Sequence, residues 1–299
     1  MKLTGLHFLL TYECNLECDH CFVWGSPWQS GTMTLDQIRE ILRQAIHLGT
    51  VEWIYFEGGE PFLYYPILTK AVQEASDMGF RVGIVSNGYW ATNNADAIEW
   101  LSPLAGLIQD LSVSSDLYHR DEKLSRQTVV ASEAAEQLHI PIDLISIAQP
   151  DEPDSPKSSG QLPFGESAVM YRGRAAQKLA GRATPRAWSD FTECPYEDLR
   201  EPARVHVDPL GNLHICQGIV IGNLFETPLS KIVNTYDPDS HAIVGPLLHG
   251  GPRELVQRHE VPHQEAYADA CHLCDHVRRE LRERFPDVLL PDQMYGVPQ

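Results

Sequence analysis

Three cysteines near the start of the chain, Cys14, Cys18 and Cys21, have a spacing that suits a metal cluster. They form a C-x3-C-x2-C loop directly after an apolar run at residues 6–10, which predicts the first strand. Three thiolates on so short a loop can hold three irons of a 4Fe-4S cubane and leave the fourth iron open to another ligand. They could also belong to a zinc site, which needs four nitrogen or sulfur donors, with His20 as a nearby fourth.

A second motif, Glu57-Gly58-Gly59-Glu60-Pro61, follows the second predicted strand at residues 51–56. Its two glycines free backbone N–H and C=O groups for close approach to a ligand. The carboxylate of Glu60 can accept a hydrogen bond from an ammonium group. Structural zinc needs no such turn, so the two motifs together favour an iron-sulfur cluster that works with a bound ligand.

The cysteine loop and the acidic glycine turn resemble the signatures of the radical S-adenosylmethionine (SAM) enzymes. In that family the open iron binds the amino and carboxylate groups of SAM, and an electron from the cluster splits the sulfonium. The resulting 5'-deoxyadenosyl radical abstracts hydrogen from an unactivated carbon. The resemblance therefore implies an enzyme with a SAM-binding 4Fe-4S cluster, SAM, and an external electron donor such as flavodoxin or ferredoxin.

The resemblance also implies which residues contact SAM. Each of these residues lies at the carboxyl end of a predicted strand or in the cysteine loop. They are His20, Gly58, Gly59, Glu60, Ser86, Asn87 and Ser114. Glu60 would hold the amino group of SAM, and His20 would contact the adenine or simply pack. Hydroxyl groups at strand ends are common everywhere, so Ser86 and Ser114 could also serve the fold alone.

Three further residues are the catalytic candidates: Asp116 and His119 beyond the fourth predicted strand, and Arg174 beyond the sixth. They are expected to point into the space where a substrate would lie. Asp116 or His119 could take the proton that is released when a radical alcohol or amide is oxidised. Each of the three could equally be a helix cap or a surface group.

Alternating strand and helix patterns through about residue 180 predict a parallel sheet covered by helices. The predicted strands are residues 6–10, 51–56, 81–86, 107–114, 142–147 and 167–171, and the predicted helices are 34–48, 67–78, 120–138 and a short one after Gly173. These units resemble the partial (β/α)6 TIM barrel of the radical SAM core, an α/β fold. Sites in such barrels lie at the carboxyl ends of the strands.

The alternating pattern of strands and helices does not continue past residue 190. Residues 204–216 predict a hairpin around a Pro-Leu-Gly-Asn turn. The remaining cysteines are Cys194 before the hairpin, Cys216 at its end, and Cys271 and Cys274 far after it. This arrangement resembles the auxiliary-cluster (SPASM) appendage of radical SAM enzymes in its shorter twitch form, which implies a second 4Fe-4S cluster. A zinc ribbon with the same four ligands is the alternative.

These patterns predict two domains. Residues 1–190 would form the radical SAM core, including a long loop at 149–163 that is rich in Pro, Ser, Asp and Gly. Residues 191–299 would form the small twitch-like domain of hairpin and helices. The loop could be a lid or a disordered segment.

Composition restricts the partners. With 23 Lys and Arg against 41 Asp and Glu, the net charge of −18 argues against nucleic-acid binding. No apolar run approaches the roughly 20 residues of a membrane helix. Seven cysteines in two groups suggest metal ligands in a reducing compartment, and hence the cytoplasm, over a disulfide framework.

The sequence therefore predicts a radical SAM oxidoreductase or maturase. The first expectation is oxidation of a small molecule with the auxiliary cluster as electron acceptor. The chain opens almost at the first strand, so we expect no leader-peptide-binding domain ahead of it. Maturation of a peptide or protein, by cross-linking or side-chain modification, is the second hypothesis, and a non-enzymatic metal or electron-transfer protein is the third.

Overall fold

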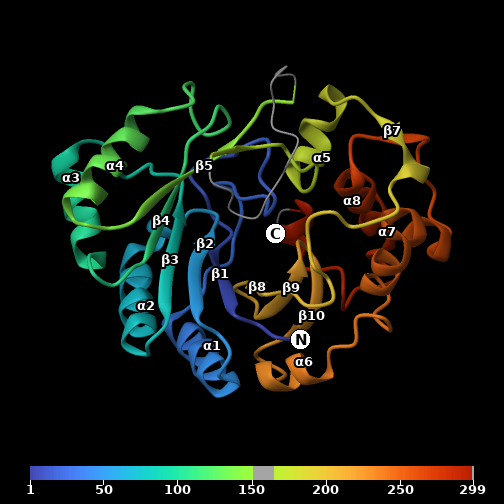
Figure 1. Cartoon of the computed structure of the whole chain (residues 1–299), viewed down its shortest axis with the longest axis horizontal. Coiled ribbons are helices and arrows are strands. Elements are labelled where there is room, and N and C mark those ends of the chain that lie inside the picture. Colours follow the sequence, from blue (N-terminus) through green and yellow to red (C-terminus); the bar gives the residue numbers. More distant parts are fainter. Residues whose placement is uncertain (151–164, 298–299) are drawn as a thin grey trace.

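The computed structural model describes residues 1–150 and 165–297 (Figure 1). Most of the loop predicted at 149–163 lies outside the described residues and stays a prediction. Within the described residues, the chain forms two halves that share one long curved sheet.

Six parallel strands build the first half of the sheet in chain order. They are β1 (Gly5–Thr11), β2 (Trp53–Gly58), β3 (Arg81–Ser86), β4 (Asp110–Ser114), β5 (Ile142–Ile147) and β6 (Gly165–Ser167). Each strand pairs in parallel with the next. Their carboxyl ends therefore meet at one edge of the sheet, as the alternating pattern predicted.

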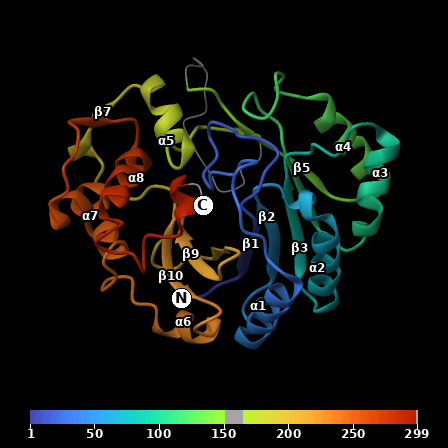
Figure 2. The same ribbon diagram turned by 180° about the vertical axis from the view of Figure 1, so that it is seen from behind.

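Helices cover the outer face of these strands (Figures 1 and 2). They are α1 (Leu35–Leu48), α2 (Tyr65–Asp77), α3 (Asn94–Leu101) and α4 (Arg126–Gln137), with single turns η1 (Pro61–Tyr64) and η2 (Ser102–Leu104). Thr34 and Gln37 form a capping box at the start of α1, and Gly49 ends the helix with a φ of 75°. The predicted limits of this helix are thus confirmed.

The second half continues the same sheet. After β6 come α5 (Arg174–Lys178), η3 (Ala180–Arg182), β7 (Arg186–Ala187), η4 (Trp188–Asp190), β8 (Arg204–Val207), β9 (Asn212–Cys216), β10 (Ile219–Asn223), α6 (Leu229–Thr235), α7 (Val244–His259), β11 (Ala266–Tyr267), α8 (Ala270–Leu281) and η5 (Asp292–Tyr295). Strand β8 pairs in parallel with β1, and β9 and β10 follow antiparallel. The predicted hairpin is confirmed, and the sheet order is β10-β9-β8-β1-β2-β3-β4-β5-β6.

Several predicted limits differ from the structure. The sixth strand ends at Ser167 and not at residue 171, because the following residues leave the sheet to line a cavity. Helix α4 starts at Arg126 and not at 120, where the side chain of Ser125 caps it. Helix α3, capped by Asn93, was not predicted. Strand β4 starts at Asp110 and not at residue 107, because η2 and a tight turn precede it.

Strand β1 lies at the centre of the sheet, and all seven of its residues are buried. Its side chains alternate between two hydrophobic cores, Leu6 and Phe8 on one face and Leu9 on the other. The first core lies under α1 to α4, and the second contains residues of β9, α7 and α8. No helix among residues 1–150 and 165–297 is long and apolar enough to span a membrane.

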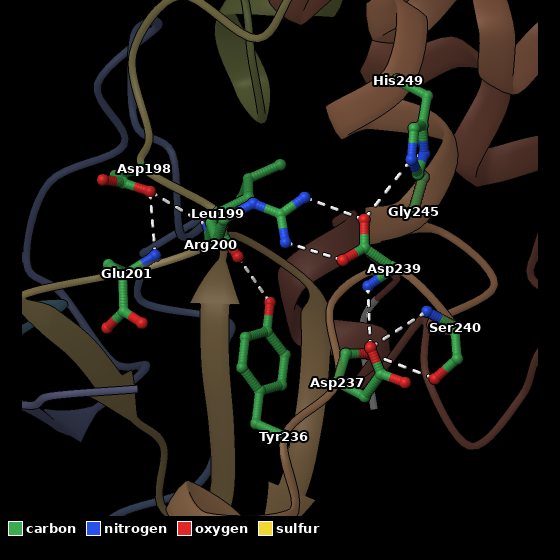
Figure 3. Close-up of polar contacts among 10 residues, drawn as sticks. All are labelled: Asp198, Leu199, Arg200, Glu201, Tyr236, Asp237, Asp239, Ser240, Gly245 and His249. Atoms are coloured by element: carbon green, nitrogen blue, oxygen red, sulfur yellow. Dashed lines mark hydrogen bonds and ion pairs between the residues drawn. The ribbon is translucent and has the colours of Figure 1, made fainter.

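The segment that leads into β8 is fastened to the chain between α6 and α7 (Figure 3). Arg200 donates to both oxygens of Asp239, at 2.6 and 2.8 Å, and Asp239 lies 3.3 Å from His249 of α7. Tyr236 donates to a backbone oxygen of the same segment at 2.6 Å. These contacts fix the path of the chain between Cys194 and β8.

Candidate active site

A cavity of about 220 Å³ lies at the carboxyl ends of the parallel strands. Ten of the residues predicted for the first site line it: Cys14, Cys18, His20, Cys21, Gly58, Gly59, Ser86, Asn87, Ser114 and His119. Glu60, Asp116 and Arg174 lie behind this lining, each at most 3 % exposed. The fold thus brings the residues of the first predicted site together at the carboxyl ends of the strands, where we expected them.

The three cysteines of the loop converge on the cavity, and two of their sulfur atoms accept hydrogen bonds. Asn87 Nδ2 lies 3.6 Å from Cys14 Sγ, and the Gly25 N–H donates to Cys21 Sγ at 3.2 Å. Burial raises the pKa of Cys14 to about 12 and also raises that of Cys18. Metal binding by these thiols must therefore release protons, and the donors around them favour the thiolate form. The residues present fit a cluster held by three thiolates with one side open to the cavity.

The glycine turn packs directly against the chain that enters the cysteine loop. The N–H groups of Gly59 and Glu60 donate to the carbonyl oxygens of Thr11 and Glu13, at 2.7 and 2.8 Å. A Cβ on Gly59 would lie 1.9 Å from the Glu13 oxygen, and Gly58 has a φ of 135°. Glycine is needed at both positions, and the close packing places the turn and the cysteines around one cavity.

Glu60 does not face the cavity. Its Oε1 accepts from the Phe62 N–H at 3.0 Å and from Ser86 Oγ at 2.9 Å, and its Oε2 accepts from the Asn87 N–H at 2.7 Å. Burial raises the pKa of this carboxyl to about 7. The geometry makes Glu60 a support for the Ser86–Asn87 turn, and its predicted contact with the SAM amino group stays a prediction.

His20, Asp116 and His119 form a buried polar group beside the cysteine loop. His119 Nδ1 lies 2.7 Å from Asp116 Oδ1, and His20 Nε2 lies 3.8 Å from Asp116 Oδ2. Burial acts to raise the pKa of Asp116, but its hydrogen bond and electrostatic interaction with the His119 imidazole outweigh it and hold that pKa below its usual range. Burial lowers the pKa of His20 to about 4. His20 and His119 both line the cavity, whereas Asp116 lies behind them.

Arg174 was expected to face a substrate, and the structure places it elsewhere. Its guanidinium donates to the carbonyl oxygens of Cys18 and Gly25, at 2.8 and 2.9 Å, and lies 5.4 Å from the ring of Trp24. A side chain at the preceding Gly173 would collide with the cysteine loop, 2.7 Å from the Cys21 oxygen. Arg174 therefore fixes the shape of the cysteine loop from behind.

The comparisons with known proteins agree with this geometry. Residues 8–128 match the radical SAM superfamily. YydG of Bacillus subtilis, a candidate peptide biosynthesis protein, is 31% identical over 111 residues, which cover 37% of this chain and 35% of YydG. The tungsten-containing aldehyde ferredoxin oxidoreductase cofactor-modifying protein of Pyrococcus furiosus is 36% identical over 107 residues, or 36% of this chain and 28% of that protein. Residues 8–128, which carry the cysteine loop and the glycine turn, are thus similar to radical SAM proteins.

Solved structures extend the likeness to the fold of the whole chain. SuiB of Streptococcus suis, bound to its precursor peptide SuiA, has a TM-score of 0.56 at 14% identity and covers 90% of this chain and 76% of SuiB. BtrN, in complex with AdoMet and 2-DOIA, has a TM-score of 0.52 at 17% identity and covers 78% of this chain and 82% of BtrN. The predicted partial TIM-barrel fold of a radical SAM protein is confirmed. The sequence matches span only about a third of the curated relatives.

One buried polar group on the barrel wall was missed from the sequence. Glu57 Oε1 lies 3.2 Å from His7 Nδ1 and 2.9 Å from His206 Nε2. Burial acts to raise the pKa of Glu57, but the two histidines hold it well below its usual range, and burial lowers the pKa of His206 to about 4. The only local signal was His7 as the polar residue of an apolar run. Its partner His206 comes from β8, which pairs with β1 in the fold.

The four remaining cysteines line a second, smaller cavity. They are Cys194, Cys216, Cys271 and Cys274, contributed by the segment before β8, the end of β9 and the first turn of α8. Two groups of three potential metal ligands, with atoms within 4.8 Å of one another, occur among the described residues. Neither group contains a cysteine. Four thiolates on one zinc would lie about 3.8 Å apart, given a Zn–S distance of about 2.3 Å. The choice between a second cluster and zinc at these four cysteines stays a prediction.

Proposed function

We propose that this protein is a radical SAM oxidoreductase with two 4Fe-4S clusters, the first at Cys14, Cys18 and Cys21 and the second at the other four cysteines. The observation that carries the proposal is that both cysteine cavities share one wall residue, Arg172. When bound, the first cluster and SAM supply the 5'-deoxyadenosyl radical. A substrate in the first cavity would then lie beside the second cysteine site.

The proposed reaction removes two hydrogens from a C–H and an adjacent O–H or N–H bond. The hydrogen atom of the C–H bond goes to the 5'-deoxyadenosyl radical, and the polar group loses its proton. His119, held by Asp116 at 2.7 Å and lining the cavity, is placed to take that proton. The auxiliary cluster, held by the other four cysteines, would supply the acceptor for the remaining electron, so that a double bond forms and the charges balance.

Ser86, Asn87 and Ser114 line the cavity and are proposed to contact SAM with the backbone of Gly58 and Gly59. His20 stacks on Tyr118 with ring centroids 4.6 Å apart, which leaves it buried beside the cysteine loop. Its Nδ1 has no hydrogen-bond partner among the described residues. An adenine nitrogen or amino group near this atom would satisfy it, which supports the proposed contact.

A small polar molecule is the proposed substrate, and a peptide is the second candidate. The likeness to SuiB, solved with a precursor peptide, and to YydG favours the second. The electron donor is proposed to be a flavodoxin or ferredoxin, and the cytoplasmic location stays a prediction from cysteine usage.

Turnover tests the proposal. Anaerobically reconstituted protein, reduced with dithionite, is given SAM with either a panel of aminocyclitols that includes 2-DOIA or peptides encoded beside its gene. Substrate-dependent 5'-deoxyadenosine and a product lighter by two hydrogens would support oxidation, whereas a cross-linked peptide would support maturation. Failure of the reduced protein to cleave SAM would leave a non-enzymatic metal or electron-transfer protein as the better reading.

A further inference from the structure

Arg172 stands between the two cysteine cavities and contacts the second cysteine site directly. It lines both cavities. Its Nη1 lies 3.9 Å from Cys216 Sγ and donates to Glu197 Oε1 at 3.0 Å. On the side of the first site, its guanidinium lies 5.2 Å from the ring of Phe22, the residue after Cys21. One buried cation is thus held at the boundary of the two sites.

A second buried cation lies against the same cysteines. Arg278 lines the second cavity, is 2 % exposed, and its Nε donates to the backbone oxygen of Cys274 at 3.3 Å. It also donates to the backbone oxygen of Gln217, which follows Cys216. Because Cys271 and Cys274 lie on the first turn of the 12-residue helix α8, its positive N-terminal end adds to the same field.

Acidic groups near the site offset only part of this charge. Glu197 is paired with Arg172, and Asp275 lies 2.7 Å from Arg279 and 3.9 Å from Arg278. Asp269 caps α8 and accepts from the N–H groups of His272 and Tyr171. Two arginines and one carboxylate, Glu197, line the second cavity, so positive charge exceeds negative charge in its lining.

We propose that Arg172 and Arg278 raise the reduction potential of the auxiliary cluster and so make it the electron acceptor of the two sites. This inference rests on the proposed function and explains why the electron of the substrate would pass to the auxiliary cluster. Reduction adds one negative charge to a cluster that four thiolates already make negative. Buried guanidinium groups stabilise that added charge strongly, because the surroundings screen it little. At the first site, Arg174 donates to the backbone oxygens of Cys18 and Gly25, whereas Arg172 lies 3.9 Å from a sulfur atom of the second site.

The test is the midpoint potential of the auxiliary cluster alone. A Cys14→Ala, Cys18→Ala, Cys21→Ala variant is reconstituted with iron and sulfide, its iron content is measured, and the cluster is titrated with EPR detection. Adding Arg172→Gln should make reduction at least tenfold less favourable, a negative shift of about 59 mV or more for one electron. Arg278→Gln should shift the potential in the same direction, and Arg172→Lys should shift it less.

Two further variants distinguish an effect of charge on the reduction potential from an effect of damage to the fold. Glu197→Gln removes the counter-ion of Arg172 and should shift the potential in the positive direction. Arg200→Gln removes an exposed arginine that pairs with Asp239 and should leave the potential unchanged. If iron is present and the Arg172 and Arg278 variants keep the parent potential, this inference fails and the auxiliary cluster stands. Zinc in place of iron would overturn the cluster itself and the inference with it.

Discussion

The two cysteine sites are built in opposite ways. Cys14, Cys18 and Cys21 come from one short loop, and a backbone N–H and the Asn87 amide donate to their sulfur atoms. The second site draws its four cysteines from three distant parts of the chain and is flanked by the buried arginines Arg172 and Arg278. The first has a large cavity on its open side, whereas the second has little free volume.

This difference separates two kinds of work. A three-cysteine loop beside a large cavity leaves room for an exchangeable ligand and a substrate. A four-cysteine site in a tight, positively charged pocket has its ligands complete and suits the storage of an electron. The local site can be recognised as a motif, but the dispersed site depends on the fold to bring its parts together.

The largest effect is expected from the loop cysteines. Replacing Cys14, Cys18 or Cys21 with Ala should abolish conversion of SAM to 5'-deoxyadenosine and methionine, because the cluster loses one of only three protein ligands. Liquid chromatography of anaerobic, dithionite-reduced reactions measures both products. A variant that cleaves SAM at the parent rate would remove this loop from the active site.

Replacing both Cys271 and Cys274 with Ala should have a narrower effect. SAM cleavage without substrate should persist, product formation should stop, and about four irons per chain should be lost, the content of one cubane. Iron analysis and product assays on the same preparation measure the two parts. Normal product formation by this variant would show that the second site is not the electron acceptor.

Glu60→Gln should lower the free energy of unfolding by about 1.5–3 kcal/mol, because a side-chain amide cannot accept from all three donors that hold the carboxyl group and one buried donor loses its partner. Urea unfolding without SAM measures the free energy of unfolding. Calorimetry measures SAM affinity, which should fall roughly ten- to hundred-fold if the binding free energy changes by a similar amount. Thr92→Ser, on an exposed turn, is a matched control. Reduced affinity with unchanged stability would favour a direct contact between Glu60 and SAM over support of the Ser86–Asn87 turn.

The narrowest effect, confined to one pH window, is expected from His206, which lines the first cavity. Its pKa is lowered to about 4 by burial, so between about pH 4 and its ordinary value near 6.5 the unfolded chain binds more protons than the folded one. Stability should therefore rise with pH across this window, and His206→Gln should flatten the rise by up to a few kcal/mol. Urea unfolding at a series of pH values measures the slope. An unchanged slope would mean that His206 is not held neutral in the folded protein.

Local patterns predicted the parts of this protein that local forces decide. Strands β3 and β5 have the predicted limits, and the capping residues of α1 were correct. The orientation of Glu60 was not predictable, because donors from the end of β3 and the following turn capture its carboxylate. Arg172 was missed because it follows an irregular stretch after β6, where no periodic pattern indicates which way a side chain points.

The pairing of β8 with β1 limits how this chain can be divided or recombined. If residues 191–299 were removed, β1 would become an edge strand with unpaired N–H and C=O groups along a fully buried apolar sequence. Such an edge readily pairs with other chains and aggregates. Relatives could therefore exchange the C-terminal part as a module only if they also preserved the register that joins His7 to His206 across the two strands.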